Sequence, residues 1–231
     1  MQEPREPELA ELAIADPPER WEALGFHVED EILDIGGVRL RLGVEGQGIV
    51  SWSLRRVNAM GSIDGLLTPV PKVLYPPPFA THPNGATGLD HLVVLTPDFS
   101  RTADALKRAG MPLKRTRETG QTRQGFRRVG PAILEIVSGA GVDGVDRAAG
   151  SDGGDGAAGV DGAAGVDGAA GVDSRFWGLA VVVVSLEELA ERLGDHLGEI
   201  RPAVQPRRRI ATLRKSAGLS TAIAFMSPEP P

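Results

Sequence analysis

The run Leu89-Asp90-His91-Leu92-Val93-Val94-Leu95-Thr96-Pro97-Asp98 decides how the chain is organised. Its apolar first part, interrupted only by Asp90 and His91, predicts a buried strand. Its last three residues end that strand and supply Asp98 as the cap of a helix. Residues 102–109 continue with apolar side chains at helical spacing, and Gly110 predicts where this helix stops.

Three further strands are expected before residue 139. Residues 113–119 and 123–129 alternate in polarity around a turn, which predicts a pair of strands. The run Ala132-Ile133-Leu134-Glu135-Ile136-Val137 predicts a closing strand that is apolar except for Glu135. Residues 89–138 are therefore expected to form a unit with the order β-α-β-β-β.

A second unit with the same order is expected over residues 175–231. An apolar strand at 176–184 leads into Ser185, which is placed to cap a helix over 186–197 with Glu188 in the capping-box position. Strands are then expected near 201–204, at 208–214 and at 222–226. Two such units in tandem predict an α+β fold.

Two segments of unusual composition separate these units from each other and from the N-terminal region. Residues 139–174 contain a repeated Gly-Ala-Ala-Gly-Val-Asp, which cannot bury enough apolar surface to offset the entropy lost on ordering. We interpret this segment as a disordered insert. Residues 64–88 contain six prolines, which exclude a helix and predict an extended strap.

Residues 1–63 form a β-rich N-terminal extension. Its pattern is similar to a degenerate third copy of the unit. It has an apolar segment at 12–18, a short expected helix at 20–24 and alternating segments at 38–42 and 49–54. Gly36-Gly37 predicts a tight turn between two strands. An unrelated sheet-forming extension is the alternative interpretation.

Composition excludes several classes of function. The chain has no cysteine, so it has no disulfide and no thiolate site. It has no apolar run long enough for a membrane span, its N-terminus is acidic rather than signal-like, and we expect a cytoplasmic protein. It has neither a glycine-rich phosphate loop nor a Gly-x-Ser-x-Gly elbow, which leaves nucleotide-dependent and serine-nucleophile chemistry without support.

The net charge of −6 is unevenly distributed along the chain. Residues 1–88 and residues 139–174 each carry −6, whereas 89–138 and 175–231 together carry +6. A basic domain within an acidic chain favours a small anionic ligand. The bases are scattered and aromatic residues are few, so nucleic acid is not an expected partner.

The two β-α-β-β-β units resemble those of the vicinal oxygen chelate (VOC) superfamily, which includes glyoxalase I, extradiol dioxygenases and bleomycin-resistance proteins. The two runs quoted above carry the resemblance in the first unit, and residues 177–182 and 222–228 carry it in the second. The resemblance implies that the tandem units form a curved, cup-like mixed sheet around a small molecule. It also implies a homodimer.

In metal-dependent members of this superfamily, the first and last strands of each unit supply one metal ligand each. The resemblance therefore implies that His91 and Glu135 bind a divalent metal, with Glu135 also serving as a catalytic general base. The corresponding positions of the second unit are Gly178 and Ala224, which cannot bind a metal through a side chain. The resemblance thus implies an incomplete metal site. The alternative is that His91 and Glu135 satisfy each other or line a hydrated cavity.

Arginines on the later strands are the candidate ligand-binding residues. An arginine that faces the cup can hold a carboxylate or a phosphate through two hydrogen bonds. We assign Arg123, Arg127 and Arg208 to this role, together with Trp177 near the floor of the cup. Strand alternation places Arg123 and Arg127 on one face and Arg128 on the other. Solvated surface is the alternative for each arginine, and core packing is the alternative for Trp177.

These observations leave three hypotheses about function. The first is a glyoxalase-like binding protein that holds a small anionic organic molecule in its cup beside a degraded metal site. The second is a metal-dependent lyase, isomerase or dioxygenase that uses His91 and Glu135. The third is a non-catalytic scaffold whose cup is filled by side chains and whose acidic insert recruits a partner.

Overall fold

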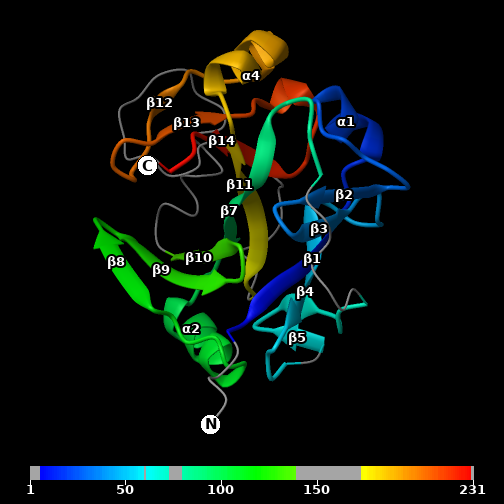
Figure 1. The fold of residues 1–231 in the computed structure, drawn as a ribbon. Helices are drawn as coiled ribbons and strands as arrows, with labels where there is room; N and C mark the ends of the chain where they lie inside the picture. Colours follow the sequence, from blue (N-terminus) through cyan, green and yellow to red (C-terminus); the bar gives the residue numbers. More distant parts are fainter. Residues whose placement is uncertain (1–5, 60, 73–79, 139–172, 230–231) are drawn as a thin grey trace.

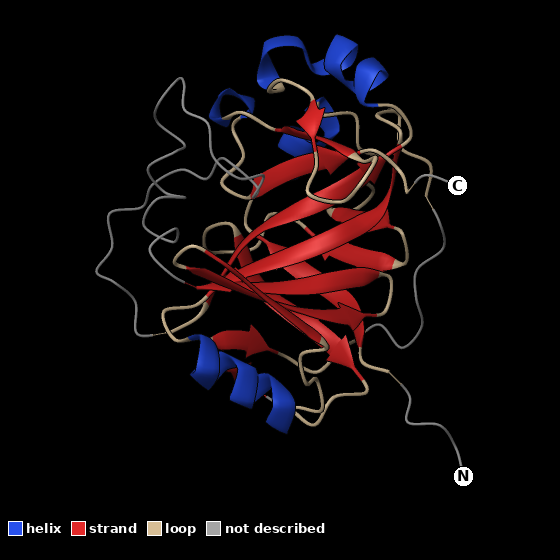
Figure 2. Cartoon of the chain, turned by 90° about the vertical axis from the view of Figure 1, so that its left-hand side faces the viewer, coloured by secondary structure: helices blue, strands red, loops and turns tan. Residues whose placement is uncertain are grey.

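The computed structural model describes residues 6–59, 61–72, 80–138 and 173–229. These residues form an eight-stranded mixed sheet, a separate four-stranded sheet and a two-stranded hairpin (Figure 1). The helices gather at the two ends of the strands (Figure 2). Nearly all of the predicted insert lies outside the described residues, so its interpretation as disordered stays a prediction.

Two β-α-β-β-β units make up the eight-stranded sheet, and the predicted α+β fold of tandem units is confirmed. The first unit comprises β7 (Ala86–Leu95), α2 (Phe99–Arg108), β8 (Arg115–Thr119), β9 (Thr122–Val129) and β10 (Ala132–Ser138). The second comprises β11 (Arg175–Val183), α4 (Leu186–Leu193), β12 (Arg201–Pro202), β13 (Arg209–Thr212) and β14 (Ala222–Met226), with 3-10 turns at Gly194–His196 and Lys215–Ala217.

The two opening strands pair antiparallel at the centre of this sheet, in the order β12-β13-β14-β11-β7-β10-β9-β8. Each opening strand also pairs in parallel with the closing strand of its own unit, β7 with β10 and β11 with β14. Each half of the sheet therefore repeats the other about an axis between β7 and β11.

Both major helices begin at the predicted caps. The Asp98 side chain accepts a hydrogen bond from the Arg101 backbone N–H at 3.0 Å, and the Ser185 hydroxyl accepts one from the Glu188 N–H at 3.1 Å. Helix α4 ends at Leu193 rather than at residue 197, because Gly194 adopts a φ of 52° and the chain continues as a 3-10 turn.

The N-terminal region repeats the element order but not the pairing of a complete unit. It comprises β1 (Glu8–Ile14), α1 (Pro18–Ala23), β2 (Ile32–Ile35), β3 (Val38–Arg41) and β4 (Ile49–Arg55), in the sheet order β2-β3-β1-β4. Here β3 is the strand parallel to β1, and β4 pairs antiparallel with the other edge of β1. The predicted turn at Gly36 and Gly37 is present, with φ values of 55° and 85°.

The N-terminal sheet shares one hydrophobic core with the eight-stranded sheet. Trp52 of β4 meets Phe176 of β11 edge to face at 5.4 Å, and Phe26 stacks against Phe225 of β14 at 6.3 Å between ring centroids. Buried Asp16 adds a polar anchor, because its carboxylate accepts hydrogen bonds from the backbone N–H groups of Ser220 and Thr221. This packing covers one face of the eight-stranded sheet.

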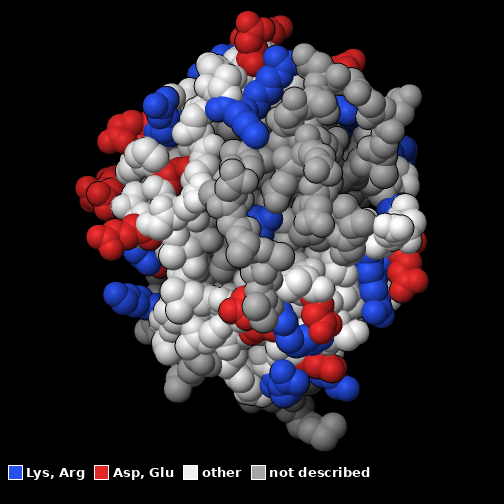
Figure 3. Space-filling view, turned by 180° about the vertical axis from the view of Figure 1, so that it is seen from behind, with Lys and Arg blue, Asp and Glu red and all other residues white. Residues whose placement is uncertain are grey.

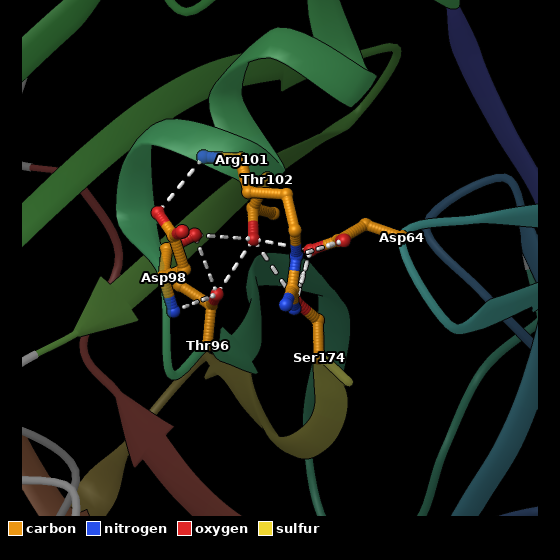
Figure 4. A network of polar contacts seen from close by, with 6 residues as sticks. All are labelled: Asp64, Thr96, Asp98, Arg101, Thr102 and Ser174. Carbon is orange, nitrogen blue, oxygen red and sulfur yellow. Dashed lines mark hydrogen bonds and ion pairs between the residues drawn. The ribbon is translucent and has the colours of Figure 1, made fainter. Parts of the chain in front are cut away.

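A buried polar network joins three parts of the chain on that covered side (Figure 4). Asp64 lies in the turn between β5 (Gly61–Ile63) and β6 (Leu66–Thr68), within the segment predicted to be a strap. Its carboxylate contacts Arg101 Nε at 2.6 Å, the Thr102 hydroxyl at 2.5 Å and the Ser174 hydroxyl at 2.6 Å. Thr102 in turn contacts the Thr96 hydroxyl at 2.6 Å. The N-terminal hairpin is thereby fixed to α2 and to the residue that precedes β11.

Burial by itself would raise the pKa of Asp64, but the hydrogen bonds from Ser174, Thr102 and Arg101 outweigh it and lower the pKa. Replacing Asp64 by Asn is expected to cost about 1–3 kcal/mol of unfolding free energy at neutral pH. Because a lowered pKa stabilises the fold only while the carboxylate is ionised, the deficit should shrink as the pH falls below the ordinary value of 3.8. Urea unfolding at several pH values measures it. Asp104→Asn, on an exposed position of α2, is the matched control, and equal deficits in both variants would contradict the role given to Asp64.

Candidate functional site

The face of the eight-stranded sheet that points away from the N-terminal sheet carries both predicted metal ligands. His91 pairs with Ile133 and Val93 pairs with Glu135, so all four side chains point to the same face. The alternate residues Leu92 and Leu134 belong to the shared core on the other face. We call the face that carries His91 and Glu135 the cup face.

A cavity of about 770 Å³ lies against this face. Residues of both units line it: His91 and Asp90 of β7, Phe126 of β9, and Arg208 just before β13. Its charged lining is mostly basic, with six bases and two acids: Lys114, Arg115, Arg117, Arg127, Arg128, Arg208, Asp90 and Glu229. An organic anion matches a cavity of this size and charge.

Asp90 links His91 to Arg208 at the centre of the cavity lining. Its carboxylate lies 2.5 Å from His91 Nδ1 and accepts a hydrogen bond from Arg208 Nη1 at 2.6 Å. Burial opposes ionisation of Asp90, but the neighbouring His91 and Arg208 outweigh it and lower its pKa. Asp90 therefore stays ionised and holds the guanidinium of Arg208 in place.

Arg208 is buried, yet it keeps one unused donor. Its Nε donates to the Ser227 carbonyl at 3.0 Å and its Nη1 binds Asp90, whereas its Nη2 is buried without a partner among the described residues. A turn that begins at Gln205 presents the side chain, and Arg207 adopts a left-handed φ of 62° within it. Such a conformation is costly outside glycine, and strain of this kind concentrates at binding sites. The turn, Asp90 and the Ser227 carbonyl thus fix the position of the Arg208 guanidinium.

Glu135 is the second acid on the cup face. The Gln124 amide donates to its Oε1 at 2.8 Å. Burial raises the pKa of Glu135, and the nearby His91, Gln124 and Arg117 only partly offset this effect. Glu135 is therefore a carboxyl group that resists ionisation beside a basic cavity.

The predicted ligand-binding residues do not all reach this cavity. Arg208 lines it from the cup face. Arg127 also borders it, but its register opposite Leu134 puts it on the other face, where it pairs with Glu6. Arg123 lies over the Phe99 ring of α2 at 4.2 Å and pairs with Glu118. Trp177 packs in a small apolar cluster on the cup face and borders a different cavity.

Sequence reasoning missed the role of three lining residues, Asp90, Arg115 and Arg117. Asp90 was visible as a charged residue inside an apolar strand, which requires a buried partner. The face on which the two arginines of β8 lie can be derived from strand alternation only when the pairing of β8 with β9 is known. Register, rather than residue type, was the missing information.

Comparison with solved structures identifies the fold. A variant of 4-hydroxymandelate synthase from Streptomyces coelicolor aligns with 96% of this chain and 93% of its own, at 14% identity and a TM-score of 0.57. Methylmalonyl-CoA epimerase from Mycobacterium tuberculosis aligns with 63% of this chain and 91% of its own, at 16% identity and a TM-score of 0.44. No protein-family model matches the sequence, and the curated proteins contain no significant match.

The chain has the vicinal oxygen chelate fold. This confirms the resemblance inferred from the two units. At these identities the likeness extends to the arrangement of the strands and not to a reaction.

At two of the four positions where the VOC resemblance implies metal ligands, Gly178 and Ala224, the side chain cannot bind a metal. The register that equates Gly178 and Ala222 with His91 and Ile133 also equates Ala224 with Glu135. A Cβ added at Gly178 would lie 2.4 Å from the Ala222 carbonyl oxygen, so this position has no room for a side chain. Among the described residues no group of three or more His, Asp or Glu side chains is placed to hold a metal.

Metal content tests this conclusion. Protein purified without chelator should contain no stoichiometric divalent metal, and added EDTA should leave its melting temperature unchanged, because no bound metal would stabilise the folded state. Elemental mass spectrometry and thermal unfolding give the two readings. Stoichiometric metal that disappears in a His91→Ala variant would overturn the conclusion and restore the metal-dependent hypothesis.

The raised pKa of Glu135 generates a separate prediction. A folded-state pKa above the ordinary value of 4.5 means that Glu135 stabilises the fold when protonated and that this stabilisation is lost as the pH rises through the folded-state pKa. Glu135→Gln should therefore raise the melting temperature at neutral pH and have little effect below pH 4.5. Glu118→Gln, on the exposed strand β8, is the control and should change neither. A loss of stability in Glu135→Gln at both pH values would contradict this account.

Proposed function

We propose that this protein binds a small anionic organic molecule in the cavity of its cup face. The observation that carries the proposal is Arg208, which is 5% exposed, lines the cavity and retains a buried Nη2 without a partner among the described residues. A buried charged donor is costly when unpaired, and a bound carboxylate would satisfy it.

The charge balance around Arg208 supports an acid as the ligand. Asp90 neutralises Arg208 only in part, because the same carboxylate also serves His91. The rest of the lining adds further bases, and its other acid is Glu229. An anion entering the cavity would therefore meet an attractive field over most of its surface.

The cavity also bears on the scaffold hypothesis, which requires a cup filled by side chains. Apolar side chains do fill one part of the cup face, where Trp177 packs against Val93, Leu95, Val137 and Ala222. The cavity beside His91 and Arg208 remains. Its basic lining favours a ligand over a filled core.

Matched small molecules test the proposal. Butyrate should raise the melting temperature in proportion to the logarithm of its concentration, because it binds only the folded state. The neutral butyramide and the cationic butylamine have nearly the same shape and should not. In Arg208→Met the effect of butyrate should vanish, whereas in Arg209→Met it should persist, because Arg209 pairs with Glu187 outside the cavity. No response to any acid, or equal responses in both variants, would refute the proposal.

None of the helices in the described part of the chain has the length and apolar character needed to cross a bilayer.

Acidic and basic side chains are interspersed over the described part of the face opposite the view of Figure 1 (Figure 3). The positive charge on which the proposal rests is that of the lysine and arginines that line the cavity.

A further inference from the structure

A second group of arginines lines the same cavity from the outer strands of the first unit. Arg115 and Arg117 on β8 pair with Phe126 and Gln124 of β9, and Arg128 on β9 pairs with Ile133 of β10. Phe126 pairs in turn with Glu135, and Ile133 with His91. Because paired residues share a face, all three arginines project from the cup face. We call them the arginine wall.

The arginine wall has no carboxylate partner among the described residues. The Arg115 guanidinium lies 5.9 Å from the centroid of the Phe126 ring, and Arg128 reaches only the Pro131 carbonyl at 3.5 Å. Some arginines on other surfaces are paired with carboxylates, for example Arg39 with Asp34 and Arg209 with Glu187. Among the described residues these arginines form no ion pair, although Arg117 acts on Glu135 from a distance, and their positive charge borders the cavity that a ligand would occupy.

Arg208 and the arginine wall occupy separate positions in the cavity. Arg208 is held at β7 through Asp90, whereas two of the wall arginines stand on β8, three strands away in the sheet order. Neighbouring strands lie about 4.8 Å apart, so the two strands are separated by about 14 Å along the sheet. The arginine side chains and the curvature of the sheet shorten this gap. A single carboxylate at Arg208 would leave the arginine wall unused.

We propose that the ligand carries two separated acid groups, one bound by Arg208 and the other by the wall of Arg115, Arg117 and Arg128. This inference rests on the proposed function, because it assigns the inner acid to the Arg208 position. Phe126 lies between the two positions in the lining and contacts both His91 and Arg115 through its ring, which supplies an apolar surface for the carbon chain that links the acids.

Calorimetric titration with chain-matched acids tests the inference. Adipate and hexanoate have carbon chains of equal length and differ in the second carboxylate. Adipate is expected to bind at least about tenfold more tightly than hexanoate, which corresponds to about 1.4 kcal/mol. The double variant Arg115→Met/Arg117→Met should remove this advantage and leave hexanoate binding unchanged. Arg208→Met should weaken both acids.

A matched control separates the arginine wall from a general effect of charge. Arg39 and Arg41 stand at the same spacing on β3, outside the cavity. The double variant Arg39→Met/Arg41→Met lowers the net charge equally and should preserve the preference for adipate. If both double variants lost the preference for adipate, the preference would arise from the net charge of the protein and not from the arginine wall, and the inference would be overturned.

The remaining outcomes distinguish this inference from the proposed function. Equal affinities for adipate and hexanoate, both reduced by Arg208→Met, would refute the second acid position and leave the binding of an anion at Arg208 intact. Absence of binding by both acids, together with no effect of butyrate, would refute the proposed function and the inference with it.

Discussion

The antiparallel pairing of β7 with β11 is the constraint on which the rest of the structure depends. It joins the opening strands of two units into one sheet and relates the units by an approximate twofold axis. It also decides which side chains share a face, so that Leu92 and Leu179 enter the core while His91 and Ala180 remain on the cup face. The N-terminal sheet then covers the core face, and the cavity lined by His91 and Arg208 lies on the opposite face.

Charge on the cup face is organised around Arg208 and Asp90. Removing two charges from water is costly, and their attraction offsets this cost only when the remaining donors and acceptors are satisfied. Among the described residues the buried Nη2 of Arg208 has no partner, whereas the carboxylates of Asp16 and Asp64 each accept several hydrogen bonds. The contrast separates charged groups whose hydrogen bonds are made within the fold from one that keeps an unused donor.

Much of the fold could be predicted because its signals are local. The caps at Asp98 and Ser185, the glycine turn at 36–37 and the strand β14 lie where the sequence places them. Helix α4 was predicted too long because Leu197 keeps the helical spacing of Leu189 and Leu193, although Gly194 ends the helix. Candidate site residues were harder to predict, because an arginine on a strand gives no sign of which face is covered. Arg208 lines the cavity, whereas Arg123 and Trp177 pack elsewhere.

Residue order and polarity were sufficient for the two β-α-β-β-β units and their helix caps, because each depends on side chains close together along the chain. Long-range pairing settled the remainder. Three contacts join residues far apart in sequence. Strand β4 pairs with one edge of β1, the Ala222 carbonyl leaves no room for a side chain at Gly178, and Asp90 accepts a hydrogen bond from Arg208. Their contacts depend on register and on the sheet that covers the opposite face, and neither is recorded in the periodicity of a single strand.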